Sequence, residues 1–113
     1  IACAAALTSL ELFEKEQTLK KVEKISDIHC EFIKKLKKIN ISKPRVLGSI
    51  AAFEYNAINK KYGSSENQEL KNIFLENGLL LRPLGNTIYL MPPYCIKEET
   101  LYNCYEKIIE ILS

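Results

Sequence analysis

Arg82 is the side chain in this sequence best suited to recognise a ligand. Lysines and arginines number 16, and only Arg45 and Arg82 are arginines, whose planar, two-pronged guanidinium pairs with carboxylates and phosphates. Arg82 directly precedes the turn-forming segment PLGN at 83–86, and a strand end beside a rigid turn holds a side chain well for binding. From spacing alone, a surface ion pair with a glutamate explains Arg82 equally well. For Arg45, which precedes its predicted strand, the surface ion pair is the better interpretation.

Tyr89 is a second candidate, because it follows the same turn on the segment predicted to face Arg82. If the two side chains share a face, the phenol lies near the guanidinium and can take part in binding. Aromatic residues in short strands more commonly pack in the core or against a cross-strand neighbour. The spacing alone therefore favours a packing role for Tyr89.

Other kinds of site are not indicated. Ser, His and Asp do not form a triad pattern, no Gly-rich phosphate loop is present, and the single His29 cannot complete a Cys/His zinc set. We expect His29 to be a packed histidine with one satisfied ring nitrogen, since it falls on the apolar stripe of a helix. The four cysteines, which show no CxxC spacing, are expected to be small buried hydrophobes in a reducing cytosol, although their even number leaves disulfides open: Cys3, Cys30, Cys95 and Cys104.

The composition describes one globular domain, or a piece of one. The chain has 113 residues, 47% of them hydrophobic, with only 4 glycines and 4 prolines, so it is expected to fold around a core. The net charge is +2 and the lysines are interleaved with glutamates, so the sequence shows no basic patch of the kind that binds nucleic acid. The longest apolar run, Ile1 to Leu7, is far shorter than the ~20 residues of a membrane span.

The elements that position the candidates follow from periodicity. Apolar spacing predicts helices near 1–16, 18–38, 66–77 and 97–112, the third with a capping box at 65–68 and Gly78 at its C-terminal end. Pro44 is expected to end the region of the second helix. Residues 45–55 then read as one strand, and residues 79–82 and 87–91 as a β-hairpin closed by the turn. The order ααβαββα predicts an α/β (α+β) two-layer sandwich, a small antiparallel sheet with helices on one face.

Three stretches carry a family resemblance: IACAAALTSLELFE at the start, RVLGSIAAFE, and above all LLLRPLGNTIYLMPPYCI followed by a helix. They resemble the C-terminal region of class III pyridoxal-phosphate aminotransferases over nearly the whole chain. The block RPLGNTIYLMPPY is the most specific part, and it is most like members that transfer an amino group from S-adenosylmethionine to 8-amino-7-oxononanoate, giving 7,8-diaminononanoate in biotin synthesis. The resemblance implies that residues 1–113 form the C-terminal small domain of a fold-type I pyridoxal-phosphate-dependent transferase.

The same resemblance implies roles for the two candidates. The arginine at position 82 would bind the carboxylate of the oxononanoate substrate, and the tyrosine at position 89 would line the substrate pocket and help to recognise the amino donor. Pyridoxal phosphate would be bound by a large domain that carries its lysine, the acid for the pyridine nitrogen and the phosphate-binding loop. We therefore expect no catalytic, cofactor-binding or metal residue in this segment, and no activity from it alone. The full-length enzyme would be a cytoplasmic homodimer with small-molecule substrates, bound to neither nucleic acid nor membrane.

One position departs from the family pattern, and several alternatives stay open. Lys97 stands where the family usually caps the last helix with threonine or serine, which loses a cap worth ~1 kcal/mol. The absence of an initial methionine and of a signal-peptide pattern suggests a chain cut from a longer one. Another class III enzyme with a different ω-amino substrate, or a stand-alone α/β binding module without catalysis, is the alternative function. The amino donor is either S-adenosylmethionine or lysine.

Overall fold

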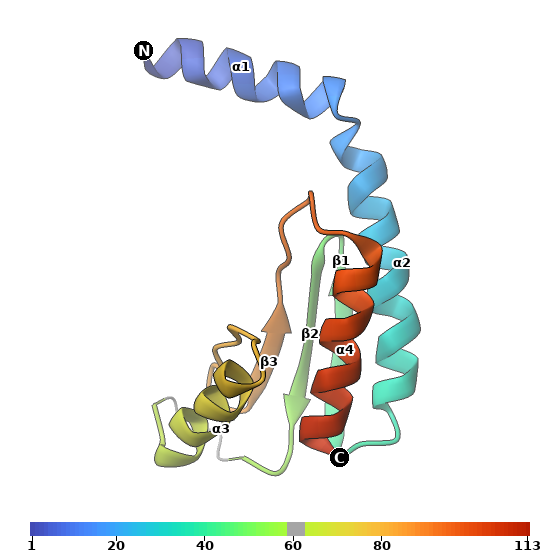
Figure 1. The fold of residues 1–113 in the computed structure, drawn as a ribbon, viewed down its shortest axis with the longest axis vertical. Helices are drawn as coiled ribbons and strands as arrows, with labels where there is room; N and C mark the ends of the chain where they lie inside the picture. Colours follow the sequence, from blue (N-terminus) through green and yellow to red (C-terminus); the bar gives the residue numbers. More distant parts are fainter. Residues whose placement is uncertain (59–62) are drawn as a thin grey trace.

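The computed structural model describes residues 1–58 and 63–113 and confirms the predicted sandwich (Figure 1). Its elements are, in chain order, α1 (Ala2–Lys15), α2 (Thr18–Leu36), β1 (Ile41–Leu47), β2 (Ile50–Tyr55), α3 (Ser65–Glu76), β3 (Thr87–Leu90) and α4 (Glu98–Leu112). The three strands form an antiparallel sheet in the order β1-β2-β3, with β2 in the centre. Helices α2 and α4 pack against each other on one face of this sheet (Figure 1).

The core lies between the sheet and these two helices. Alternate residues of β2 and β3 face the helices, and among them Phe53 on β2 and Ile88 on β3 are fully buried. From the helix side, Phe32 of α2 stacks on Tyr105 of α4 with ring centroids 4.5 Å apart. Burying one such side chain stabilises the fold by roughly 1.5–3 kcal/mol, so this layer holds the sandwich together.

The predicted strand over 45–55 is wrong, because the structure divides it into β1 and β2. Leu47 pairs with Ile50, which leaves Gly48 and Ser49 as a two-residue turn, and Gly48 adopts a φ of +55° that favours glycine. The apolar run is therefore a hairpin, with Gly48 in its turn.

Pro44 does not end a region as predicted, since it lies inside β1. β1 is an edge strand, and the register shifts between Ser42 and Arg45, so the missing N–H of proline costs no ladder hydrogen bond in the sheet centre. Lys43, with a φ of 47°, takes up the irregular backbone at this bulge.

The predicted hairpin between 79–82 and 87–91 is also wrong, because 79–82 is not a strand. Only an isolated bridge between Leu84 and Thr87 closes the turn, and β3 pairs with β2 instead. The N–H of Leu79 is used by the end of α3, where it donates to the Phe74 carbonyl at 2.8 Å, next to Gly78 with its φ of +78°. The observed order is thus ααββαβα.

The helix ends agree closely with the sequence. The N-cap of α3 is Ser64, one residue before the predicted box, and its hydroxyl accepts a hydrogen bond from the N–H of Asn67 at 3.3 Å. Gly78 follows the end of α3 as predicted. Lys97 makes no side-chain cap for α4, as the departure from the family pattern implied.

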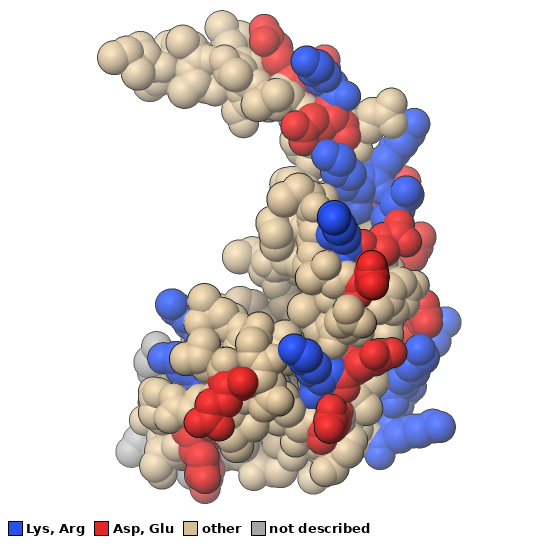
Figure 2. Space-filling model, viewed as in Figure 1, with Lys and Arg blue, Asp and Glu red and all other residues tan. Residues whose placement is uncertain are grey.

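α1 stands apart from this sandwich. It buries none of its residues, projects away from the sheet in Figure 1, and turns into α2 at Gln17, whose φ is 51°. Figure 2 shows that the outer part of α1 carries no charged side chains, which agrees with the absence of Lys, Arg, Asp and Glu before Glu11. Among the described residues, no helix combines the length and apolarity that crossing a membrane requires.

Candidate functional site

A groove of about 410 Å³ lies between the free edge of β3, α4 and the segment that follows α3. We call it the apolar groove; its walls are residues 78–82 and 89–93 with Ile96, and the α4 side chains Leu101, Cys104 and Ile108. No aspartate or glutamate is among these residues. Its lining therefore suits an aliphatic ligand, with any charged end placed at the rim.

Arg82 and Tyr89 both line the apolar groove, although 79–82 is not the strand that the sequence predicted. The two-residue turn at 85–86, with Gly85 at a φ of 60°, folds the chain back so that the two residues meet. Tyr89 is half-buried and lies opposite Ala52 in the sheet, on the face away from Leu90. The turn, more than strand pairing, brings the two candidates together.

The Arg82 guanidinium has no ion-pair partner in the part of the chain that the structure describes. The side chain is exposed, and the surface ion pair with a glutamate that the spacing allowed is not formed. Because its guanidinium is exposed and unpaired among the described residues, Arg82 is available to an external anion. A carboxylate or phosphate would form two parallel hydrogen bonds with it, which is the most favourable pairing for a guanidinium.

A second groove, of about 480 Å³, adjoins the first at Arg82 and Tyr89. We call it the polar groove; it is lined by Gly63, by Asn67, Gln68 and Lys71 of α3, and by Arg82, Pro83, Leu84 and Tyr89. Arg82 and Tyr89 thus belong to both grooves. The α3 residues were not singled out as a site from the sequence, and their one signal was three polar residues at i, i+1 and i+4 of the predicted helix.

His29 is fully buried and lies outside both grooves. Its packed role is confirmed, but both ring nitrogens are satisfied instead of one: Nε2 lies 2.9 Å from the Ser49 carbonyl and Nδ1 lies 2.6 Å from the Tyr105 hydroxyl. The carbonyl can only accept, so Nε2 carries the proton and the Tyr105 hydroxyl donates to Nδ1. Burial lowers the pKa of His29, and the hydrogen bond to Ser49 partly opposes this shift. The ring is a neutral link between α2, α4 and the β1–β2 turn.

The cysteines are free, and the prediction that they are buried is wrong for Cys3, Cys30 and Cys95, which are exposed. Cys3 lies on α1, Cys30 on the outer face of α2, and Cys95 in the loop before α4. None of these three positions faces the core. Cys104 is half-buried in the apolar groove, where burial raises the pKa of its thiol and Lys107 opposes the shift. Within the described residues, no group of three or more His, Cys, Asp or Glu side chains is placed to hold a metal ion.

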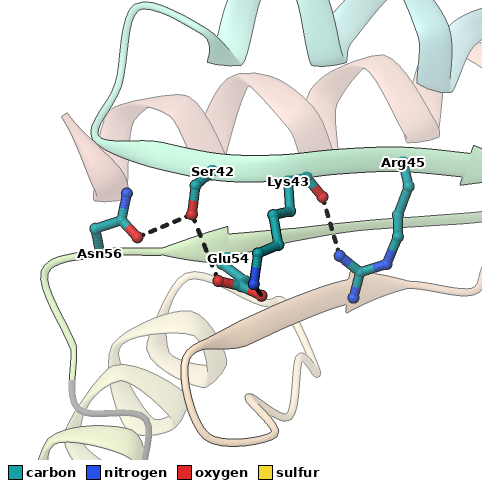
Figure 3. Close-up of polar contacts among 5 residues, drawn as sticks. All are labelled: Ser42, Lys43, Arg45, Glu54 and Asn56. Atoms are coloured by element: carbon teal, nitrogen blue, oxygen red, sulfur yellow. Dashed lines mark hydrogen bonds and ion pairs between the residues drawn. The ribbon is translucent and has the colours of Figure 1, made fainter.

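Arg45 belongs to a small polar cluster at the bulge of β1, shown in Figure 3. Lys43 Nζ lies 2.9 Å from the Glu54 carboxylate, and the Ser42 hydroxyl lies 3.0 Å from Asn56 Oδ1. Arg45 is exposed, as expected, but it donates to the Lys43 carbonyl at 2.9 Å instead of pairing with a glutamate. The cluster ties the irregular edge strand to β2, and we assign it no ligand.

Comparison with known proteins places these features in a family. The family model described as Aminotransferase class-III matches residues 1–112. A relative from Synechococcus elongatus named adenosylmethionine-8-amino-7-oxononanoate aminotransferase is 34% identical over 114 residues, which cover 100% of this chain. A protein of the same name from Helicobacter pylori is 36% identical over 118 residues and also covers 100% of this chain. The chain spans only 26% of the length of each of these relatives.

Solved structures show the same fold. The acetylornithine aminotransferase of Elizabethkingia anophelis superposes with a TM-score of 0.82 and 34% identity, over 98% of this chain and 29% of that one. The adenosylmethionine-8-amino-7-oxononanoate aminotransferase of Methanocaldococcus jannaschii superposes with a TM-score of 0.75 and 31% identity, over 96% of this chain and 27% of that one.

Proposed function

The chain belongs to the class III aminotransferases, and from that membership we propose that it is the C-terminal small domain of a longer enzyme, to which it contributes the binding site for a substrate carboxylate. The enzyme transfers an amino group from S-adenosylmethionine, or from lysine, to 8-amino-7-oxononanoate, and its product enters biotin synthesis. Curated relatives that carry the name of this reaction support the choice of substrate.

One observation carries the proposal: Arg82, without an ion-pair partner among the described residues, stands at the rim of an apolar groove. The acceptor 8-amino-7-oxononanoate has a carboxylate at one end of an aliphatic chain and its reacting carbonyl near the other end. A guanidinium that binds the carboxylate fixes the position of the substrate's aliphatic chain and of its reacting carbonyl. The apolar groove removes the methylene groups of the substrate from water. Tyr89, on the same rim, takes part in recognising the amino donor.

The described residues do not fit pyridoxal phosphate, and we place this cofactor outside them. Family members bind it through a lysine in a closed site, whereas every described lysine here is exposed or half-buried. The chain's own part in the reaction is therefore binding and orientation of substrate. A homodimeric, cytoplasmic full-length enzyme remains part of the proposal and rests on the family alone.

A second function within the family has specific support. The acetylornithine aminotransferase superposes with a higher TM-score than the M. jannaschii structure does, at similar identity. Substrate preference separates the two: the full-length enzyme should convert 8-amino-7-oxononanoate efficiently and acetylornithine poorly. A preference for acetylornithine would replace the biotin assignment and leave the family unchanged.

The proposal is tested by changing Arg82 in the full-length enzyme and measuring each half-reaction by single-turnover kinetics. Arg82→Ala removes a charge-assisted pair worth about 1.5–3 kcal/mol, so we expect roughly ten- to a hundredfold weaker use of the acceptor. Arg82→Lys keeps the charge but loses the planar fork, and a smaller defect is expected. The half-reaction with the amino donor should suffer less in both variants.

Arg45→Ala is the matched control, because it removes the other arginine, whose guanidinium donates to a backbone carbonyl and has no ion pair among the described residues. We expect it to leave both half-reactions unchanged. Equal losses with donor and acceptor in Arg82→Ala, or loss of the folded state, would show that Arg82 is structural.

A further inference from the structure

Lys71 on α3 lines the polar groove together with Arg82. It is half-buried, whereas most described lysines, including those on the outer face of α2, are exposed. Among the described residues it has no ion-pair partner within 4.0 Å, so the groove is bordered by two cations that no carboxylate of the described chain neutralises.

The rest of the polar groove also favours an anion. No aspartate or glutamate is among its described lining residues, and a cleft bordered by one sign of charge concentrates ions of the opposite sign. One N–H of the Gln68 amide donates to Asn72 Oδ1 at 3.1 Å, which orients the amide and leaves its second N–H for a ligand. Two cations and an oriented amide donor match the acceptor-only oxygens of a carboxylate.

The two grooves meet at Arg82 and Tyr89, which line both. The two grooves therefore adjoin at this point, and a ligand whose aliphatic chain lies in the apolar groove can extend past Arg82 and Tyr89 toward the polar groove. Only a molecule with an anionic end beyond an apolar stretch uses both grooves at once. A long-chain carboxylic acid with its reacting group at the far end of the aliphatic chain has this form.

We propose that Lys71, assisted by Gln68, is a second cation for the carboxylate held by Arg82, and that this pair selects acceptors that carry a terminal carboxylate. The inference rests on the proposed function and deepens it, since it adds residues of α3 to the recognition of the acceptor. A carboxylate between the two cations also removes the repulsion between them, which favours binding of the ionised acid over its neutral derivatives.

The test uses Lys71→Gln in the full-length enzyme, with Lys34→Gln as matched control. Lys34 is exposed on α2, outside both grooves, so the control removes the same charge from the molecule without touching either site. Acceptor binding is measured by single-turnover kinetics with 8-amino-7-oxononanoate and with its methyl ester, which lacks the negative charge. We expect Lys71→Gln to weaken binding of the acid about tenfold and to leave the ester and the donor half-reaction unchanged.

A double variant shows whether the two cations hold one carboxylate. If they do, the effects of Lys71→Gln and Arg82→Lys on the acid are coupled and not additive, and the coupling disappears with the ester. Lys71→Arg should restore most of the affinity.

The remaining outcomes overturn the inference. A Lys71→Gln enzyme that behaves like Lys34→Gln, while Arg82→Lys still discriminates acid from ester, removes Lys71 from the site and leaves the proposed function standing. Equal losses with acid and ester mean that Lys71 acts only on the structure of α3. If neither the Arg82 nor the Lys71 variants discriminate acid from ester, the proposed carboxylate site fails as a whole.

Discussion

At the scale of single residues, Tyr89 combines a packing position with a place on the rim of both grooves. Its ring is half-buried beside Ala52, and the phenol makes no hydrogen bond among the described residues. Tyr89→Phe keeps the ring and removes only the hydroxyl, so it separates hydrogen bonding from packing. We expect slower single-turnover rates with the amino donor and an unchanged melting temperature. Unchanged donor rates with a lowered melting temperature would make the hydroxyl purely structural.

His29 gives a second prediction at this scale, on the pH dependence of stability. Its pKa is lowered in the folded state, so below the ordinary value of about 6.5 the unfolded chain binds a proton that the folded chain does not. The stabilising effect of the neutral ring is complete above that pH and is lost as the pH falls through the folded pKa. Urea unfolding of the 113-residue chain should therefore show a falling free energy of unfolding between pH 7 and pH 5, with a slope of at most ~1.4 kcal/mol per pH unit.

The control is His29→Asn, which removes the only histidine of the chain. Carboxylates titrate mostly below this window, so the variant, though less stable, should show little pH dependence in it. The same slope in both proteins would show that another group is responsible.

At the scale of elements, α1 is the helix that contributes no buried residue to the core. It buries no residue, and its large apolar side chains are open to water, with exposed fractions of 62% for Leu7, 65% for Leu10 and 41% for Phe13. An apolar helix of this kind favours association with other copies. Deleting residues 1–16 should abolish self-association of the chain in analytical ultracentrifugation and leave its melting temperature nearly unchanged.

The double variant Leu7→Glu/Leu10→Glu keeps the full length and tests the same point. It should be as monodisperse as the deletion. A large fall in the melting temperature on deletion would mean that α1 packs on the sandwich, and a monodisperse parent chain at high concentration would contradict the association itself.

At the scale of the whole molecule, the grooves are open and every described lysine is exposed or half-buried, which predicts a domain that binds substrate and does not catalyse alone. Mixed with pyridoxal phosphate, the 113-residue chain should show only the absorption of the free cofactor after gel filtration, and no transaminase activity. The full-length enzyme, purified in parallel, is the positive control. A stable coloured complex or turnover by the chain alone would contradict this assignment.

Local sequence patterns determined the helices of this protein. The apolar spacing, the capping box at 65–68 and Gly78 predicted α3 within about a residue at each end, because caps and periodicity act between near neighbours along the chain. The block from Arg82 to Tyr89 likewise carries the family resemblance and contains both candidate residues. The antiparallel sheet with helices on one face followed from the one-sided apolar stripes of the helices.

Tertiary structure decided the rest, since strand pairing and burial depend on partners that are distant in sequence. Residues 45–55 became two strands because Gly48 turns the chain, and β3 paired with the central strand β2 because residue 79 is used to end α3. The exposure of Cys3 follows from its place on α1, which buries none of its residues. Lys71 and Arg82 line the same groove because α3 lies beside the turn at 83–86. No local sequence pattern encodes this contact between distant segments.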